Sequence, residues 1–124
     1  MDDGLTDAGD EAAWMIHLIR ERATEEQVRE LLEALQTYIK LAVDVQQRIL
    51  AGGGTLHADC EAALLEAGSQ QADIWGADWF PASQEVRFES LINIRPKQGN
   101  RSLLIGDPAL REMVEAIARE RLSG

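Results

Sequence analysis

Residues 50–69, LAGGGTLHADCEAALLEAGS, contain the densest group of side chains in this sequence that could do chemistry. Three consecutive glycines can expose backbone N–H groups to an anion, and His57, Cys60 and Glu61 are of types that bind metal ions. Neither the Gly-Lys-Ser/Thr of a phosphate-binding loop nor the G-x-G-x-x-G dinucleotide pattern is present. With two histidines and one cysteine in the chain, a zinc site would need carboxylates from elsewhere. The stretch therefore favours a tight turn and a helix with Cys60 buried, and it predicts neither a metal nor a cofactor.

The loop 95–101, RPKQGNR, is the one basic island in an acidic sequence. It places Arg95, Lys97 and Arg101 within seven residues and includes no acid. Such a loop can receive a phosphate, a carboxylate or an acidic protein partner. With Arg87 and Asn100 added, these residues are the predicted ligand-binding set; a solvated connection without a ligand is the alternative.

Three carboxylates give a second kind of candidate chemistry. Asp44, Asp78 and Glu89 fall on neighbouring predicted strands. If they converge within about 5 Å, they could hold Mg²⁺ and hydrolyse a phosphodiester, helped by Arg87 and Arg95. A small metal-dependent phosphodiester hydrolase is therefore the alternative function. No nucleophile elbow or readable catalytic triad accompanies it.

The strands that must position these residues are recognised by alternation. Residues 38–47 alternate apolar and polar side chains, and 73–80 and 85–95 do the same on either side of a four-residue turn. Residues 15–21 predict a further short strand. Residues 48–54 either extend the strand before them or turn back as its hairpin partner.

Three helices follow from spacing and capping. Thr24 and Gln27 match a capping box at the start of an amphipathic helix that runs to about residue 35. Residues 55–67 form a second apolar stripe, and Gly68 is suited to end that helix. Asp107 and Pro108 are a typical N-cap and first residue for the last helix.

Together these elements predict an α+β fold of two layers, with a mainly antiparallel or mixed sheet and about three helices on one face. Trp75 and Trp79 would face the helices as core residues rather than serve as a stacking platform. The reverse face would then be polar and open, and would carry Asp44, Asp78, Arg87, Glu89 and Arg95. Leu91 interrupts that polar pattern, which predicts partial cover of the face, for example by the second copy in a homodimer.

The bulk properties exclude several classes of protein. The net charge is −10, and residues 1–14 carry five acids and no cation, so electrostatic binding to nucleic acid is not expected. No apolar run is long enough to cross a membrane, and a lone cysteine fits a reducing cytoplasm. The expected organisation is a disordered acidic tail over 1–13 and one domain over 14–124.

Two long stretches, from LAVDV through RILAGGG to DIWGADW and from EVRFESLINIRP to QGNRS, resemble a family of small bacterial proteins classed as a domain of unknown function. The resemblance covers nearly the whole chain from Met15 onward, and it implies a domain that begins near Met15. It implies no activity and no functional residue. We therefore expect a small cytoplasmic binding or interaction protein that uses the polar sheet face and the basic loop.

Overall fold

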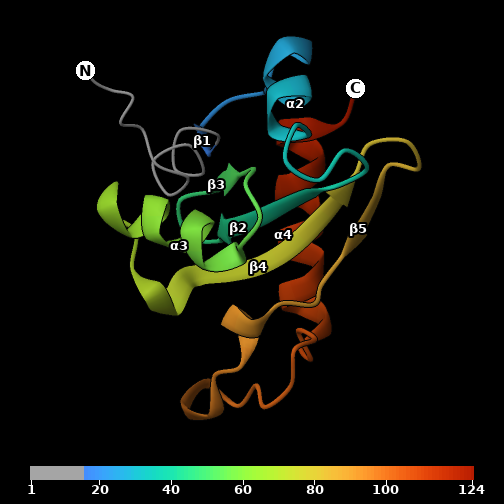
Figure 1. Ribbon diagram of the computed structural model, residues 1–124. Coiled ribbons are helices and arrows are strands. Elements are labelled where there is room, and N and C mark those ends of the chain that lie inside the picture. The colour runs from blue at the N-terminus through green and yellow to red at the C-terminus, as the bar shows by residue number, and fades with distance from the viewer. Residues whose placement is uncertain (1–15) are drawn as a thin grey trace.

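The computed structural model describes residues 16–124, and its centre is one antiparallel sheet of five strands (Figure 1). The strand order is β1-β3-β2-β4-β5. Their bounds are β1 His17–Ile19, β2 Ile39–Asp44, β3 Ile49–Gly52, β4 Ile74–Phe80 and β5 Glu85–Arg87. Residues 48–54 turn back rather than extend β2, which settles the open alternative in favour of the hairpin.

Three α-helices surround the sheet: α2 Glu25–Leu31, α3 His57–Glu66 and α4 Pro108–Leu122. Thr24 and Gln27 form the predicted capping box at α2, and the Asp107 side chain accepts from the N–H of Ala109 at α4. Gly68 directly follows Ala67, the C-cap residue of α3, and its φ of +107° is a conformation that glycine adopts without strain. The predicted α+β class, with an antiparallel sheet and three helices, is confirmed.

One face of the sheet forms the larger apolar core, and α2 and α4 cover it. Alternate residues of β2 and β4 point to this side, including Leu41, Trp75 and Trp79. They pack with Val114 and Ile117 of α4. The prediction that both tryptophans are core residues is confirmed, since Trp75 is 5% and Trp79 0% exposed.

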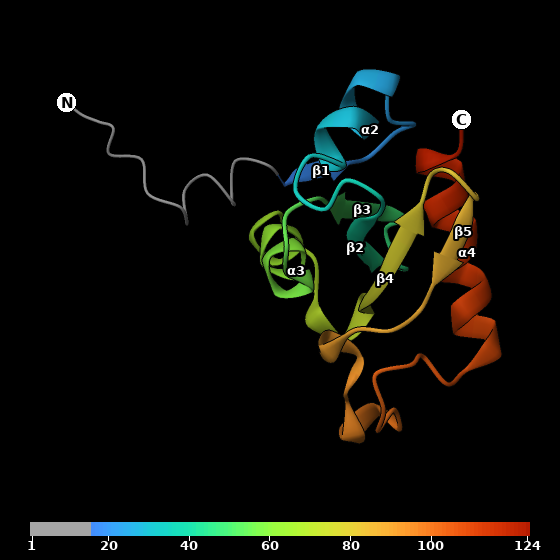
Figure 2. The same cartoon turned by 45° about the vertical axis from the view of Figure 1, so that its right-hand side comes forward.

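The opposite face is covered by α3, and this corrects the placement of all three helices on one side. Figure 2 shows α3 and α4 on opposite sides of the sheet. Cys60 and Leu64 of α3 pack against Ala42 of β2 and Ala51 of β3. Alanines at these positions let a helix approach the sheet closely, so the face predicted to be open is a second, smaller core. The molecule therefore has helices on both faces of its sheet.

The predicted strand 85–95 is also shorter in the structure, because β5 ends at Arg87. Beyond β5, the side chain of Asn93 pairs with the backbone of β4 where a neighbouring strand would otherwise do so. Its side-chain oxygen accepts from Gly76 N at 2.8 Å and its amide nitrogen donates to Gly76 O at 3.0 Å. A Cβ at Gly76 would lie 2.5 Å from Ser90 Cβ, so this close approach requires glycine. The segment that follows β5 consists of two 3-10 helices, η2 Leu91–Asn93 and η3 Pro96–Gln98, joined by loops.

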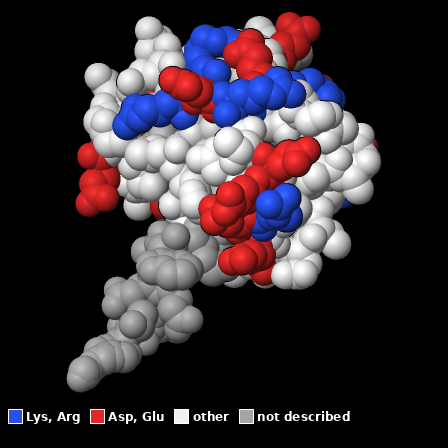
Figure 3. All heavy atoms as spheres, turned by 90° about the horizontal axis from the view of Figure 1, so that it is seen from above, with Lys and Arg blue, Asp and Glu red and all other residues white. Residues whose placement is uncertain are grey.

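Charge is intermixed on the face seen from above, over α2 and the C-terminal end of α4 (Figure 3). Ion pairs such as Arg48–Glu120 at 2.6 Å and Arg119–Glu115 at 2.9 Å belong to the exposed surface. The predicted acidic tail, residues 1–13, lies outside the described residues. Within residues 16–124, no helix combines the length and apolar character needed to span a membrane.

Candidate functional site

Two side chains of α3, one turn apart, attach the helix to the rest of the molecule. His57 Nε2 lies 2.8 Å from Asp78 Oδ1 on β4, and Glu61 Oε2 lies 3.3 Å from a terminal nitrogen of Arg95. All four side chains are largely withdrawn from water, with exposed fractions of 8% to 15%. This spacing of four residues puts both groups on one face of the helix, and that face borders the candidate site.

The neighbours of His57 determine its tautomer. Its Nε2 atom lies within hydrogen-bond distance of two acceptors, the Asp78 carboxylate and the carbonyl oxygen of Ala77 at 3.1 Å. Nε2 therefore carries a proton, which it donates to these acceptors. Cys60, one turn away, does not supply a nucleophile: burial raises the pKa of its thiol to about 12.

Arg95 is the most highly connected side chain of the site. It donates to the carbonyls of Gln71, Ile74 and Ile92 and to the side chains of Glu61 and Gln98. These contacts use all five N–H donors of the guanidinium group. Burial lowers the pKa of Arg95 despite the opposing effect of Glu61.

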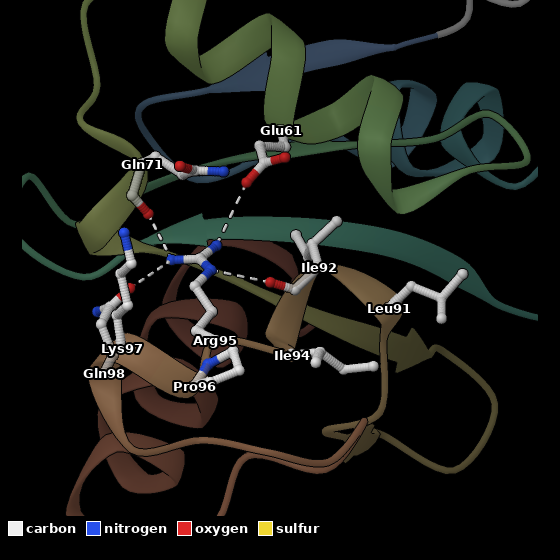
Figure 4. A pocket seen from close by; sticks show the side chains of 9 residues that line it. All are labelled: Glu61, Gln71, Leu91, Ile92, Ile94, Arg95, Pro96, Lys97 and Gln98. Atoms are coloured by element: carbon white, nitrogen blue, oxygen red, sulfur yellow. Dashed lines mark hydrogen bonds and ion pairs between the residues drawn. The ribbon is translucent and has the colours of Figure 1, made fainter.

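A pocket of about 570 Å³ lies between α3 and η3, and we call it the α3–η3 pocket. Figure 4 shows Gln71 and Lys97 at one end, Arg95 and Glu61 in the middle and Leu91 at the other end. Its walls are Glu61, Gln71, Leu91, Ile92, Ile94, Arg95, Pro96, Lys97 and Gln98. The pocket thus changes from polar to apolar along its length.

A second pocket of about 360 Å³ surrounds the His57–Asp78 pair, and we call it the His57 pocket. Lys40 and Glu89 contribute charge to it, and Leu56, Leu91 and Leu103 contribute apolar surface. Leu91 and Ile92 line both pockets, so η2 separates them.

Around these pockets the protein exposes five large aliphatic side chains, which we call the leucine surface. Leu91 is 77% exposed and Leu56 is 56% exposed. The remaining members, Ile94, Leu103 and Leu104, are between 41% and 44% exposed. Pocket lining connects Leu91 to Leu56, Leu103 and Ile94, and Leu104 is bridged to Glu89, which lines the His57 pocket. An apolar group of this kind on a small protein is typical of a contact surface.

The predicted ligand-binding residues divide into two groups. Arg95 and Asn100 are buried and serve the fold: the Asn100 amide donates to three carbonyls and its oxygen accepts from Gly106 N. Arg87, Lys97 and Arg101 are exposed. Of these three, Lys97 lines the α3–η3 pocket, whereas Arg87 pairs with Glu85 and lies over the ring of Phe80.

The three carboxylates of the hydrolase alternative do not converge. Asp44 pairs in the sheet with Ile74 and Asp78 with Lys40, which separates them by four residues along β4, roughly 13 Å. Asp44 is fully buried and accepts from Ser69 and the turn after β2, while Glu89 is exposed beyond β5. Within the described part of the chain, no three His, Cys, Asp or Glu side chains are grouped to hold a metal ion.

The glycine run and Cys60 have the structural roles that the sequence favoured. Gly53 and Gly54 adopt positive φ in the turn before α3, and Cys60 is fully buried. Sequence reasoning grouped His57 and Glu61 as possible metal ligands but missed their partners. The one available signal for those partners was that Asp78 and Arg95 are charged residues next to predicted core positions.

Comparison with known proteins identifies the family. Residues 17–121 match the family described as "Protein of unknown function (DUF5674)". The chain belongs to the DUF5674 family. No curated protein and no solved structure is detectably similar to it. The resemblance seen in the sequence is thereby confirmed, and the family assigns no activity to the site.

Proposed function

We propose that this DUF5674 protein binds a small amphipathic anion, such as a carboxylate with an apolar tail, in the α3–η3 pocket. The observation that carries the proposal is the change in polarity along the pocket, from Lys97 and Gln71 at one end to Leu91 at the other (Figure 4). Its volume falls within the range of pockets that hold small ligands.

Electrostatics support an anion rather than a cation. Lys97 is an exposed cation of the lining and Arg95 is a buried one, and Glu61 is the one acid that faces them, so the charged side chains of the lining carry an excess positive charge. A bound anion would stabilise both charges, whereas a cation would be repelled by them. Because all five donors of Arg95 are already used, it contributes its charge while Lys97 and Gln71 supply the direct hydrogen bonds.

Preorganisation supports binding as well. Arg95 connects η1 (Gln71–Asp73), β4, η2 and α3 through its hydrogen bonds, so several walls of the pocket are attached to one side chain. A ligand that enters a pocket already ordered loses less free energy to ordering the protein.

Titration with hexanoate, followed by protein NMR, tests the proposal. We expect saturable shifts at Leu91, Ile94 and Lys97, with weaker binding of acetate, which lacks the tail, and of hexanol, which lacks the charge. Lys97→Gln should weaken hexanoate binding about five-fold, as expected for one partly exposed ion pair. Arg101→Gln is the matched control, since it removes the same charge from the same loop but not from the pocket.

Equal binding by Lys97→Gln and Arg101→Gln would contradict the proposal, as would hexanol binding as tightly as hexanoate. A cytoplasmic location belongs to the same proposal. It is supported by the free, buried thiol of Cys60, which suits a reducing compartment.

A further inference from the structure

The leucine surface has no use within the described chain. Its five side chains are the most concentrated exposed apolar group of residues 16–124; the other large exposed hydrophobics are Leu65 on α3 and Met113 on α4. The ligand proposed above would contact only the Leu91 and Ile94 part of it. Exposed apolar area of this kind is stabilised when another surface removes it from water.

The charges next to the leucine surface differ from those of the whole chain. The two pockets are lined by three cations and three acids: Lys40, Arg95, Lys97, Glu61, Asp78 and Glu89. The chain as a whole has a net charge of −10. This region is therefore locally neutral and carries both signs.

We propose that the leucine surface is the interface of a homodimer. In a two-fold symmetric contact the same surface meets itself, so it must be self-complementary in charge as well as apolar. A locally neutral region that bears Lys40 and Lys97 beside Glu89 satisfies this condition, because two copies of it bring together no excess of either charge. A strongly basic partner would find more complementary charge elsewhere on so acidic a chain.

The position of Leu91 makes it the centre of the contact. It is the most exposed of the large hydrophobic side chains and lines both pockets. Apolar side chains at the centre of an interface carry most of its binding free energy, while the surrounding polar residues contribute little.

Light scattering coupled to size-exclusion chromatography of the full chain, without ligand, tests the proposal. We expect twice the monomer mass at high protein concentration and dissociation on dilution. Leu91→Asp should give a monomer, because two carboxylates would be buried across the two-fold axis. Leu65→Asp is the matched control: it makes the same change at an exposed leucine of α3 outside both pockets, and it should leave the mass doubled.

Salt gives an independent readout. Raising the salt concentration should strengthen the dimer, because it screens the repulsion between two copies of charge −10 and does not weaken an apolar contact. A monomer at every concentration would overturn the proposal. So would equal effects of Leu91→Asp and Leu65→Asp, or dissociation by salt, which would indicate a contact held by ion pairs. Because no ligand is present, these outcomes are independent of whether the pocket binds a carboxylate.

Discussion

The two faces of the sheet are stabilised in different ways. The face under α4 buries large apolar side chains, including Trp75, Trp79 and Leu41. The face under α3 has a smaller apolar cluster, and on it and beside it lie the buried polar residues Asp44, Asn93 and Arg95. The first face depends on apolar area, and the second depends on complete hydrogen bonding of buried polar groups. Both pockets lined by the leucine surface lie on the second side, where the chain departs from regular secondary structure.

The largest effect is expected on the α4 face. Trp79→Ala should lower the free energy of unfolding by about 3–5 kcal/mol, because it removes a fully buried ring and leaves a cavity. Urea denaturation measures this. Met113→Ala, at an exposed position of α4, should change stability by less than about 0.5 kcal/mol. If the two variants were equally stable, the α4 face would not be the dominant core.

The next effect is expected at Asn93 beside α3. Asn93→Ala should destabilise the fold by about 2–3 kcal/mol, because the buried N–H and C=O of Gly76 lose their partner. Hydrogen exchange at the Gly76 amide should become faster in this variant. Arg101→Ala, at an exposed position of the same segment, is the control. Unchanged protection at Gly76 would mean that another group satisfies it.

Cys60 gives the α3 face a dependence on pH. Burial, with a smaller effect of Asp59, raises the pKa of the thiol from 9.0 to about 12 in the folded protein. The unfolded chain therefore loses a proton above pH 9 while the folded protein keeps it, and stability falls as the pH rises from 9 toward 12. Relative to Cys60→Ala, the wild type should lose about 1 kcal/mol between pH 8 and pH 10. Parallel stability profiles for the two proteins would show that the thiol ionises freely in the fold.

The smallest effect is expected for the ion pair at the edge of α3. Glu61→Gln should cost about 1 kcal/mol or less, since Arg95 keeps its other four partners and the glutamine amide oxygen can still accept a hydrogen bond from it. The exposed Glu66→Gln on the same helix should have no measurable effect on urea denaturation. A loss of several kcal/mol at Glu61 would indicate that the pair, rather than the carbonyl contacts, orders Arg95.

The sequence predicted local structure correctly where apolar and polar side chains follow a single period along the element. Alternation in 39–44 and 74–80 identified the two central strands and the tryptophan face, and the Thr24 capping box placed the start of α2. The α3 face was missed because Lys40 and Asp44 made its side of β2 look polar. Ala42 between them was the position that allowed α3 to pack there.

The candidate site was harder to predict because its contacts are distant in sequence. Glu61 and Arg95 are 34 residues apart, and His57 and Asp78 are 21 residues apart. Alternation also fails to predict the structure after Arg87. There the side chain of Asn93 makes the hydrogen bonds to the Gly76 backbone that a neighbouring strand would otherwise make, and no periodic sequence pattern indicates such a contact. Lys97 is exposed in the loop, whereas Arg95 and Asn100 are buried, and residue type alone does not distinguish these positions.

The five hydrogen bonds of Arg95 have a consequence for how the protein would withstand digestion. The segment from Phe88 to Gly106 contains only 3-10 turns and isolated bridges, and Lys97 and Arg101, two sites of tryptic cleavage, are exposed within it. A protease must pull several residues of such a segment into an extended form before it can cut. Arg95 and Asn100 hold the backbone on both sides of Lys97, so this irregular stretch should resist nicking as well as the strands do.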